Sequence, residues 1–303
     1  MRIESDLPLR SAAWPYPLVR AMRVHQWAKN LLLVLPALAA HRLPTPALVG
    51  SLLVAILSFS LLASAVYLVN DIEDVEHDRQ NPTKRLRPVA SGQLTVRAAA
   101  GGAAVLAAVA LVLTTALPPW FRLVWAAYLA LSSAYSFGLK RVVVLDVMVL
   151  GALFTSRVIA GATAVNVDLS RWFLAFAVFF FSSLALLKRM VESKGVAERD
   201  QESLAGRGWT VQDAPLLLGF GAACSVASAL VYCLYITSDE VRRLYDRPDL
   251  LWLGLPIFLY WLGRVWLLAN RGEVHEDPVL FALRDGPSYL VAAAMAAVLL
   301  LAA

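Results

Sequence analysis

The sequence predicts an all-α integral membrane protein with nine transmembrane helices. Hydrophobic residues make up 59% of its 303 residues and charged residues 16%, and the mean hydropathy is +0.65. A soluble domain is nearer about 45–50% apolar and roughly 25% charged. The apolar residues also lie in blocks of about 17–25, the length of helix that crosses a bilayer. Helices are expected because a spanning backbone must satisfy its own polar groups, and the alternating pattern of barrel strands is absent.

The nine expected spans follow one another along the whole chain. The first differs from the others because Lys29 and Asn30 lie near its start and Pro36 lies inside it. No polar stretch is long enough for a soluble domain, so a single transmembrane domain is expected over residues 1–303, with residues 1–22 as a cytoplasmic tail. The spans are expected at residues 27–41, 47–69, 97–117, 119–137, 142–164, 171–187, 214–236, 250–269 and 287–303.

Positive charge is unevenly distributed between the spans. With nine spans, Lys and Arg concentrate in the segments on the same side as the N-terminus. Loops rich in Lys and Arg stay in the cytoplasm, so the N-terminus is expected to be cytoplasmic and the C-terminus outside. The net charge of +5 alone could suggest anionic partners, but the distribution of Lys and Arg is more informative, and nucleic acid is not expected as a partner.

The stretch VNDIEDVEHDRQNPTKRLRPVASG (69–92) is strongly charged and follows the second span. Asn70, Asp74 and Asp78 are spaced four residues apart, so on a helix they share one face, with Asp71 close by as a further candidate ligand. Mg²⁺ usually takes one or two carboxylates and leaves its other positions to water and phosphates. The spacing therefore predicts a magnesium site at the cytoplasmic end of the second span.

Basic residues follow the acidic ones closely. Lys84, Arg85 and Arg87 come soon after Asp78, near enough for the chain to fold back over a phosphate. Arginine offers a bidentate fork to phosphate oxygens and lysine a point charge. Acids for a metal and bases for phosphate, at a membrane surface, predict a site for a lipid diphosphate or a sugar diphosphate. A merely solvated charged loop is the alternative, and the regular spacing argues against it.

The two halves of this stretch, NDIEDVEHD and KRLRPVASG, resemble the first signature of the UbiA superfamily of intramembrane prenyltransferases. The resemblance implies a UbiA-type helical bundle with a polar cavity on the cytoplasmic side, and Mg²⁺-dependent chemistry on an isoprenoid or diphosphate substrate. It places Asn70, Asp74 and Asp78 at metal-binding positions and Lys84 and Arg87 at diphosphate-binding ones. The expected catalytic residues are Asp74, Asp78, Lys84 and Arg87.

The second signature of the superfamily is different in this chain. Members that prenylate aromatic rings usually carry Asp-x-x-x-Asp after the sixth helix, where this chain reads LLKRMVESKGVAERDQES (186–203). Glu192 is the candidate metal ligand that remains there. Lys188 and Arg189 stand where acidic residues are expected, which argues against two metal clusters on a prenyl diphosphate.

A narrower resemblance links four stretches to one branch, the decaprenyl-phosphate phosphoribosyltransferases. It implies that phosphoribosyl pyrophosphate is the soluble donor and a membrane-bound polyprenyl phosphate the acceptor, for cell-envelope polysaccharide precursors at the inner membrane of a bacterium. Prenyl chain length and oligomeric state are left open. The stretches are RVHQWAKN (23–30), YLVNDIEDVEHDRQNPTKRLRP (67–88), LLKRMVE (186–192) and EDPVLFALRD (276–285).

Polar residues inside the expected spans are further candidates for substrate binding. Lys29 either extends its charge to the lipid headgroups or binds a phosphate, with Gln26 and Asn30 bonding nearby oxygens. Arg157 lies near mid-span, about three turns from Asp146 on the same face. Charges at such depth tend to face a partner or a polar cavity. Asp146 and Arg157 are each expected to form an ion pair with another helix. For Arg157, the other possibility is that it binds a phosphate.

The inner end of the sixth span offers cations for a phosphate. Lys188 and Arg189 are the candidates, although Lys188 is also spaced to pair with Glu192 four residues on. Tyr67 and Tyr135 either line the pocket or belong to the aromatic belts of the membrane. The loop at 270–286 contains further residues that would cap the site: Glu276, Asp277, Arg284 and Asp285.

Two other functions are alternatives. A UbiA-type prenyltransferase would move a prenyl chain from a prenyl diphosphate to an aromatic acceptor, making a quinone or haem precursor. The absence of a second Asp-x-x-x-Asp from the sequence argues against it. A cation-dependent transporter often shows inverted repeats or broken helices in both halves. The acidic cluster at 70–78 has no counterpart elsewhere in the sequence.

Overall fold

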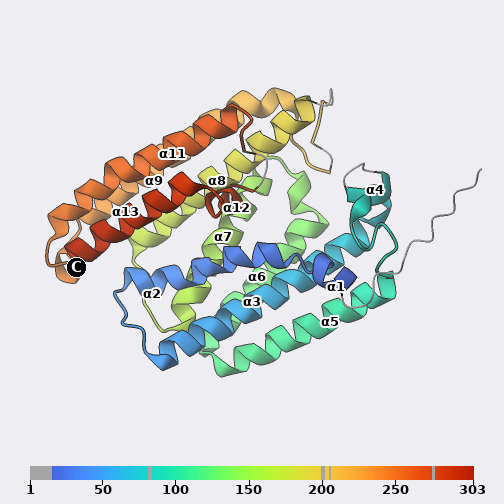
Figure 1. Ribbon diagram of the computed structural model, residues 1–303, viewed down its shortest axis with the longest axis horizontal. Helices are drawn as coiled ribbons and strands as arrows, with labels where there is room; N and C mark the ends of the chain where they lie inside the picture. The colour runs from blue at the N-terminus through green and yellow to red at the C-terminus, as the bar shows by residue number, and fades with distance from the viewer. Residues whose placement is uncertain (1–15, 81–83, 199–201, 205, 275–276) are drawn as a thin grey trace, which may run out of the picture. The chain divides into compact units, whose positions relative to one another are not determined.

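The computed structural model describes residues 16–80, 84–198, 202–204, 206–274 and 277–303. The described residues form helices joined by short connections (Figure 1), with one isolated bridge between Ser203 and Thr210. The chain divides into two compact units. The first unit comprises Met1–Trp27 and Leu53–Ala116, and the second comprises Ala28–Leu52 and Leu117–Ala303.

The first unit is built on two long apolar helices, α3 and α5. Ala21 and Leu68 pack with Ala103 in its core, and the Ser58 hydroxyl donates to the Ala110 carbonyl oxygen at 2.8 Å. Figure 1 shows α3 and α5 side by side. The elements are α1 (Tyr16–Ala21), the start of η1 (Val24–Val34), α3 (Pro46–Glu73) from Leu53 onward, α4 (Val75–Gln80), η2 (Lys84–Leu86), α5 (Val96–Leu113) and η3 (Thr114–Ala116).

The second unit contains the remaining helices, with α7, α8 and α9 packed on one another. Gly221 of α9 lies against the Trp266 ring, so a Cβ there would approach the ring to 2.0 Å. The elements are α2 (Leu35–Ala39), α6 (Pro119–Phe137), η4 (Leu139–Arg141), α7 (Leu145–Ala164), α8 (Arg171–Ala197), η5 (Val211–Asp213), α9 (Ala214–Ile236), α10 (Asp239–Leu244), η6 (Pro248–Leu253), α11 (Gly254–Asn270), α12 (Pro278–Ala282) and α13 (Gly286–Ala302).

Helical elements cover all nine expected spans, but not uniformly. Within the described part of the chain, six helical stretches are long and apolar enough to cross a membrane; α6 is not among them, and α13 is shorter. A total of nine spans therefore stays a prediction. The six are Pro46–Glu73, Val96–Ala116, Leu145–Ala164, Arg171–Ala197, Val211–Ile236 and Pro248–Asn270.

The first expected span, 27–41, is not one α-helix. It consists of the 3₁₀ helix η1 followed by the short helix α2. Pro36 lies in the first turn of α2. Proline lacks an N–H and its ring clashes with the carbonyl four residues back, so a new helix starts there rather than the old one continuing. Lys29 and Asn30 are buried within η1.

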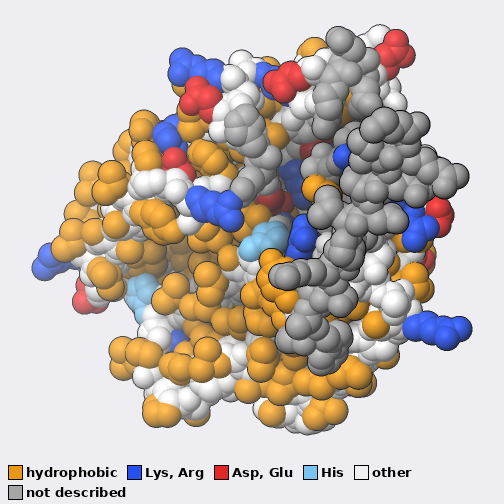
Figure 2. All heavy atoms as spheres, turned by 45° about the vertical axis from the view of Figure 1, so that its right-hand side comes forward, with side chains coloured by type: hydrophobic (Ala, Val, Ile, Leu, Met, Phe, Trp, Pro, Cys, Tyr) orange, Lys and Arg blue, Asp and Glu red, His pale blue; other side chains and the backbone are white. Residues whose placement is uncertain are grey.

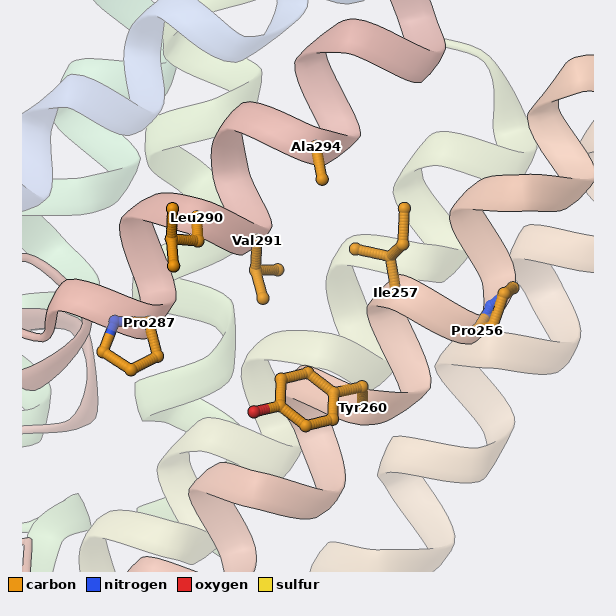
Figure 3. A pocket seen from close by; sticks show the side chains of 7 residues that line it. All are labelled: Pro256, Ile257, Tyr260, Pro287, Leu290, Val291 and Ala294. Atoms are coloured by element: carbon orange, nitrogen blue, oxygen red, sulfur yellow. The ribbon is translucent and has the colours of Figure 1, made fainter.

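The exterior is largely apolar, as expected for a chain embedded in lipid. Hydrophobic side chains make up most of the face drawn in Figure 2. Leu290 and Leu300 of α13 are largely exposed. A pocket between α11 and α13, shown in Figure 3, has Tyr260 as its only lining side chain with a polar atom, so it suits hydrocarbon rather than phosphate. The other lining residues are Pro256, Ile257, Pro287, Leu290, Val291 and Ala294.

Candidate functional site

The acidic stretch keeps its helical spacing across a break between two helices. α3 ends at Glu73 and α4 begins at Val75. Even so, the Asp74 N–H donates to the Asn70 carbonyl oxygen at 2.9 Å, and the Asp78 N–H donates to the Asp74 carbonyl oxygen at 2.8 Å. These bonds four residues apart place Asn70, Asp74 and Asp78 along one face, as the spacing predicts.

Two buried carboxylates at this helix end bind arginines. Arg87 Nη1 lies 2.6 Å from Asp78 Oδ2 and 3.3 Å from Asp71 Oδ1. Arg23 Nη2 lies 2.5 Å from the same Asp71 oxygen, and its guanidinium lies over the Tyr67 ring at 4.8 Å. The side chains of Asp71 and Asp78 are 1% and 2% exposed. The acids thus orient both guanidinium groups.

Arg87 is held in place by the tight turn that follows it. The Ser91 N–H donates to the Arg87 carbonyl oxygen at 2.9 Å. Gly92 has φ +79°, in the left-handed region where glycine carries no steric penalty. Val89 and Ala90 are buried beneath the turn. The sequence RPVASG therefore forms a packed loop that presents Arg87 to the carboxylates.

Asn70 offers an oxygen to a cation. Its Oδ1 is buried and has no hydrogen-bond partner, which is uncommon because an unsatisfied buried oxygen is destabilising. Among the described residues, no three His, Cys, Asp or Glu side chains are grouped to hold a metal. Mg²⁺ needs only one or two carboxylates when phosphates and water complete its shell. Asn70, Asp74 and Asp78 therefore fit a metal shared with a substrate, not one enclosed by protein.

Two other predicted residues of the first unit are half-buried. Lys84 begins η2, and Gln26 lies in η1, where its backbone N–H donates to the Arg23 carbonyl oxygen at 2.7 Å. Their roles in phosphate binding stay predictions. Arg23 was not singled out from the sequence, although it opens the stretch RVHQWAKN and lies in the left-handed region with φ +52°.

In the second unit, Lys29 and Lys188 share one carboxylate. Lys29 Nζ lies 2.8 Å from Asp277 Oδ2, and Lys188 Nζ lies 3.1 Å from the same oxygen. The side chains of Lys29 and Asp277 are 9% and 8% exposed. Asp277 Oδ1 accepts a hydrogen bond from the Val279 N–H at 3.2 Å and so caps α12. Three distant stretches of sequence meet at this carboxylate.

Other residues of the 270–286 loop lie elsewhere. Asp285 caps α13 and binds Arg264 with both oxygens, at 2.6 and 3.0 Å. Glu276 lies outside the described residues. Of the acidic residues expected to cap the site, Asp277 is therefore the one that the structure pairs with the predicted phosphate-binding lysines.

The two lysines keep Asp277 ionised. Burial alone would raise the pKa of this carboxyl, but the ammonium groups of Lys188 and Lys29 outweigh burial and hold its pKa well below its usual range. A carboxylate that stays charged at neutral pH serves as a counter-ion for the two cations.

Arg157 lies close to Lys29 but has uncharged partners. Its guanidinium donates to Asn30 Oδ1 at 3.0 Å, to the Tyr128 hydroxyl at 2.8 Å and to the Leu153 carbonyl oxygen. The Arg157 guanidinium carbon and Lys29 Nζ lie 5.5 and 5.6 Å from the centroid of the Phe154 ring. Within the described part of the chain, Arg157 forms no ion pair. The binding of a phosphate by Arg157 stays a prediction.

Asp146 and Arg189 form a fully buried ion pair between α7 and α8. Arg189 Nε lies 2.6 Å from Asp146 Oδ2, and both side chains are 0% exposed. The Tyr135 hydroxyl donates to Asp146 Oδ1 at 2.8 Å, Trp209 Nε1 donates to Oδ2 at 3.0 Å, and Arg207 Nη1 lies 3.2 Å from Oδ1. This is the ion pair with another helix that was one of the two expectations for Asp146. It ties α6 and the segment before η5 to the α7–α8 pair.

Glu192 has guanidinium partners. It pairs with Arg189 Nη1, and Arg207 Nε lies 3.3 Å from its Oε2. Lys188 pairs with Asp277 rather than with Glu192, contrary to the alternative drawn from their spacing. The roles of Glu192 as a metal ligand and Arg189 as a phosphate ligand stay predictions. Arg207 and Trp209 were missed because they lie in a connection that has no periodic pattern.

The chain belongs to the UbiA prenyltransferase family, which matches residues 31–284. This confirms the superfamily inferred from the first acidic motif. The chain is therefore a multi-pass membrane protein of a transferase family, and its all-helical fold is the one expected.

Three known proteins are similar to this chain over most of its length. The chain is 38% identical over 282 residues to the uncharacterized protein y4nM of Sinorhizobium fredii, covering 93% of this chain but 55% of that protein. It is 32% identical over 271 residues to the nodulation protein NoeC of Azorhizobium caulinodans, covering 88% of this chain and 87% of that one. It is 40% identical over 276 residues to the decaprenyl-phosphate phosphoribosyltransferase of Mycolicibacterium smegmatis, covering 88% and 86%.

A solved structure shares the fold. The UbiA homolog from Archaeoglobus fulgidus bound to DMAPP and Mg²⁺ superimposes with a TM-score of 0.71 over 93% of this chain and 99% of that one. The two sequences are 16% identical, so the match speaks for the fold alone.

Proposed function

We propose that this protein transfers the 5-phosphoribosyl group from phosphoribosyl pyrophosphate to a polyprenyl phosphate, with Mg²⁺ and with release of pyrophosphate. The observation that carries the proposal is the cation set of the second unit: Lys29, Lys188 and Arg157 with Asp277 as their carboxylate partner. Such a set suits a phosphate monoester. The phosphoribosyltransferase relative supports the choice of donor.

The residues of the first unit suit the pyrophosphate of the donor. Asn70, Asp74 and Asp78 would hold Mg²⁺, which when bound offsets the negative charge of the leaving pyrophosphate. Arg87 can present a bidentate fork to phosphate oxygens, and Lys84 adds a point charge. Asp78 orients the Arg87 fork at 2.6 Å before substrate binds.

The acceptor needs no strong general base, because a lipid phosphate is already an anion. The bond between ribose C1 and the pyrophosphate oxygen breaks, and a bond forms between C1 and an oxygen of the lipid phosphate. Lys29, Lys188 and Arg157 would bind and orient a phosphate for this exchange, which is electrostatic stabilisation and positioning.

The surroundings of Glu192 favour this donor over a prenyl diphosphate. Two metal clusters would need cation ligands in both acidic regions, and in the first region Asn70 offers an oxygen that has no hydrogen-bond partner. The carboxylate of Glu192 instead lies against the guanidinium groups of Arg189 and Arg207. A soluble donor also places the reaction on the cytoplasmic side of the bacterial inner membrane, as the distribution of Lys and Arg indicates.

The test combines purified protein in lipid nanodiscs with ribose-labelled phosphoribosyl pyrophosphate, a polyprenyl phosphate and Mg²⁺. We expect label in the lipid fraction and no label when a chelator is added. A parallel arm supplies a prenyl diphosphate and an aromatic acid. Product only in that arm would support the aromatic prenyltransferase instead, and turnover in neither arm would leave the transporter.

A further inference from the structure

The second unit contains its own anion at the position where the proposed function needs a phosphate. Asp277 Oδ2 accepts hydrogen bonds from Lys29 Nζ and Lys188 Nζ, at 2.8 and 3.1 Å. The two lysines come from η1 and α8, whereas Asp277 directly precedes α12. A single carboxylate oxygen therefore holds together two cations that are far apart in the sequence.

The charges around this carboxylate do not balance. Lys29, Lys188 and Arg157 are three cations, and the partners of Arg157 are all uncharged. Glu192 also attracts Lys188, but its carboxylate already pairs with Arg189 and Arg207. Counted over the whole residue, side chain and backbone together, Arg157 is 6% exposed and Lys29 is 7% exposed. Buried cations without counter-ions are destabilising, so this set favours an anion with more charge than one carboxylate.

We propose that the Asp277 carboxylate occupies, in the unliganded protein, the place of a substrate phosphate, and that the phosphate binds by displacing it. The inference rests on the proposed function, because it concerns the same cations. A phosphate monoester carries up to about two charges and three acceptor oxygens, enough for both ammonium groups and a guanidinium. Asp277 offers the lysines one oxygen, since Val279 N–H binds the other.

The need to displace Asp277 lowers the apparent affinity of the unmodified protein for the phosphate. When the competent form is a fraction of the population, the dissociation constant rises in inverse proportion to that fraction. Asp277→Asn removes the competing charge but keeps a good cap for α12, because Asn and Asp are similar N-caps. We expect Asp277→Asn to bind a phosphate monoester about tenfold more tightly, as for a competent fraction of about one in ten.

The measurement is a binding titration on the full chain in nanodiscs. Phosphoribosyl pyrophosphate and a polyprenyl phosphate are titrated separately into the unmodified protein and into Asp277→Asn. The ligand whose affinity rises is the source of the phosphate. Asp285→Asn is the matched control, because Asp285 also caps a helix and pairs with an arginine, Arg264 at 2.6 Å, but touches neither lysine. Its dissociation constants should equal those of the unmodified protein.

Hydrogen exchange on the unmodified protein gives a second test that needs no variant. If phosphate displaces Asp277, the Val279 amide loses its acceptor, and its exchange should become faster as ligand is added. A ligand that only stabilises the fold would slow this exchange. Slower or unchanged exchange at saturation would overturn the displacement.

The outcomes separate the two proposals. If the unmodified protein binds ligand and Asp277→Asn binds it equally or more weakly, Asp277 positions the lysines and the displacement is wrong, while the proposed function stands. If the unmodified protein binds neither ligand, the proposed function itself fails. Tighter binding by both Asp277→Asn and Asp285→Asn would show a general charge effect and would also contradict the displacement.

Discussion

Individual side chains in the acidic stretch have two different kinds of surroundings. Asp71 and Asp78 are buried against arginines, whereas Asp74 is half-buried between them along the chain. Asn70 adds an oxygen with no hydrogen-bond partner. The same short stretch thus orients guanidinium groups and presents the Asn70 oxygen without a hydrogen-bond partner, and the binding of a metal and phosphate there stays a prediction.

Asp74→Asn tests the predicted metal binding alone, whereas Asp78→Asn tests it together with the ion pair between Asp78 and Arg87. We expect at least a hundredfold loss of turnover, because a carboxylate ligand is lost, with little change in the unfolding midpoint. Asp78→Asn should lose turnover and also lower the midpoint, because Arg87 loses a partner at 2.6 Å. Steady-state kinetics and thermal unfolding in detergent give the two readouts. Full activity in both variants would rule out the metal assignment.

At the scale of the helices, some of the arrangement could be predicted and some could not. Asn70, Asp74 and Asp78 stay on one helical face across the break between α3 and α4, because local backbone hydrogen bonds continue through it. The meeting of Lys29 with Asp277 depends on tertiary packing, and no local pattern encodes it. The sequence supplied the candidates in the second unit, and only the fold shows their partners.

The buried pair between α7 and α8 gives an element-scale prediction. Asp146→Asn removes the fully buried carboxylate partner of Arg189 and leaves Glu192 as its remaining one, so the loss of stability should approach about 3–5 kcal/mol. Glu76→Gln is the matched control, because its pair with Arg79 is exposed. Pairs of that kind contribute less than about 1 kcal/mol. Denaturant unfolding compares the two, and equal effects would contradict the structural role of Asp146.

The turn that holds Arg87 gives a second prediction about stability. Gly92→Ala forces a side chain into the left-handed region, at a cost of about 1–2 kcal/mol, although no atom would touch the added Cβ. Gly101→Ala in α5 also has open space but lies in a helix, so it should stabilise by about 0.5–1 kcal/mol. Opposite shifts in the unfolding midpoint are expected. Shifts of the same sign would show that the Gly92 backbone is not constrained.

At the scale of the whole molecule, each compact unit contains buried ion pairs within an apolar protein. The first unit pairs carboxylates with arginines, and the second gathers cations around Asp277. Composition and block length were enough to predict an all-α membrane fold, because the bilayer imposes both. They did not reveal that the first expected span is divided into the 3₁₀ helix η1 and the helix α2, since hydropathy does not distinguish one type of helix from another.

The proposed reaction transfers one phosphoribosyl group to a lipid phosphate for each pyrophosphate released. The direct measurement follows both products from ribose-labelled phosphoribosyl pyrophosphate, with and without polyprenyl phosphate, in the presence of Mg²⁺. We expect equal amounts of lipid-linked label and pyrophosphate, and neither product without the lipid. Either of two results would rule out the proposed transfer. One is release of pyrophosphate without lipid-linked label, and the other is active transfer from a prenyl diphosphate when this donor does not react.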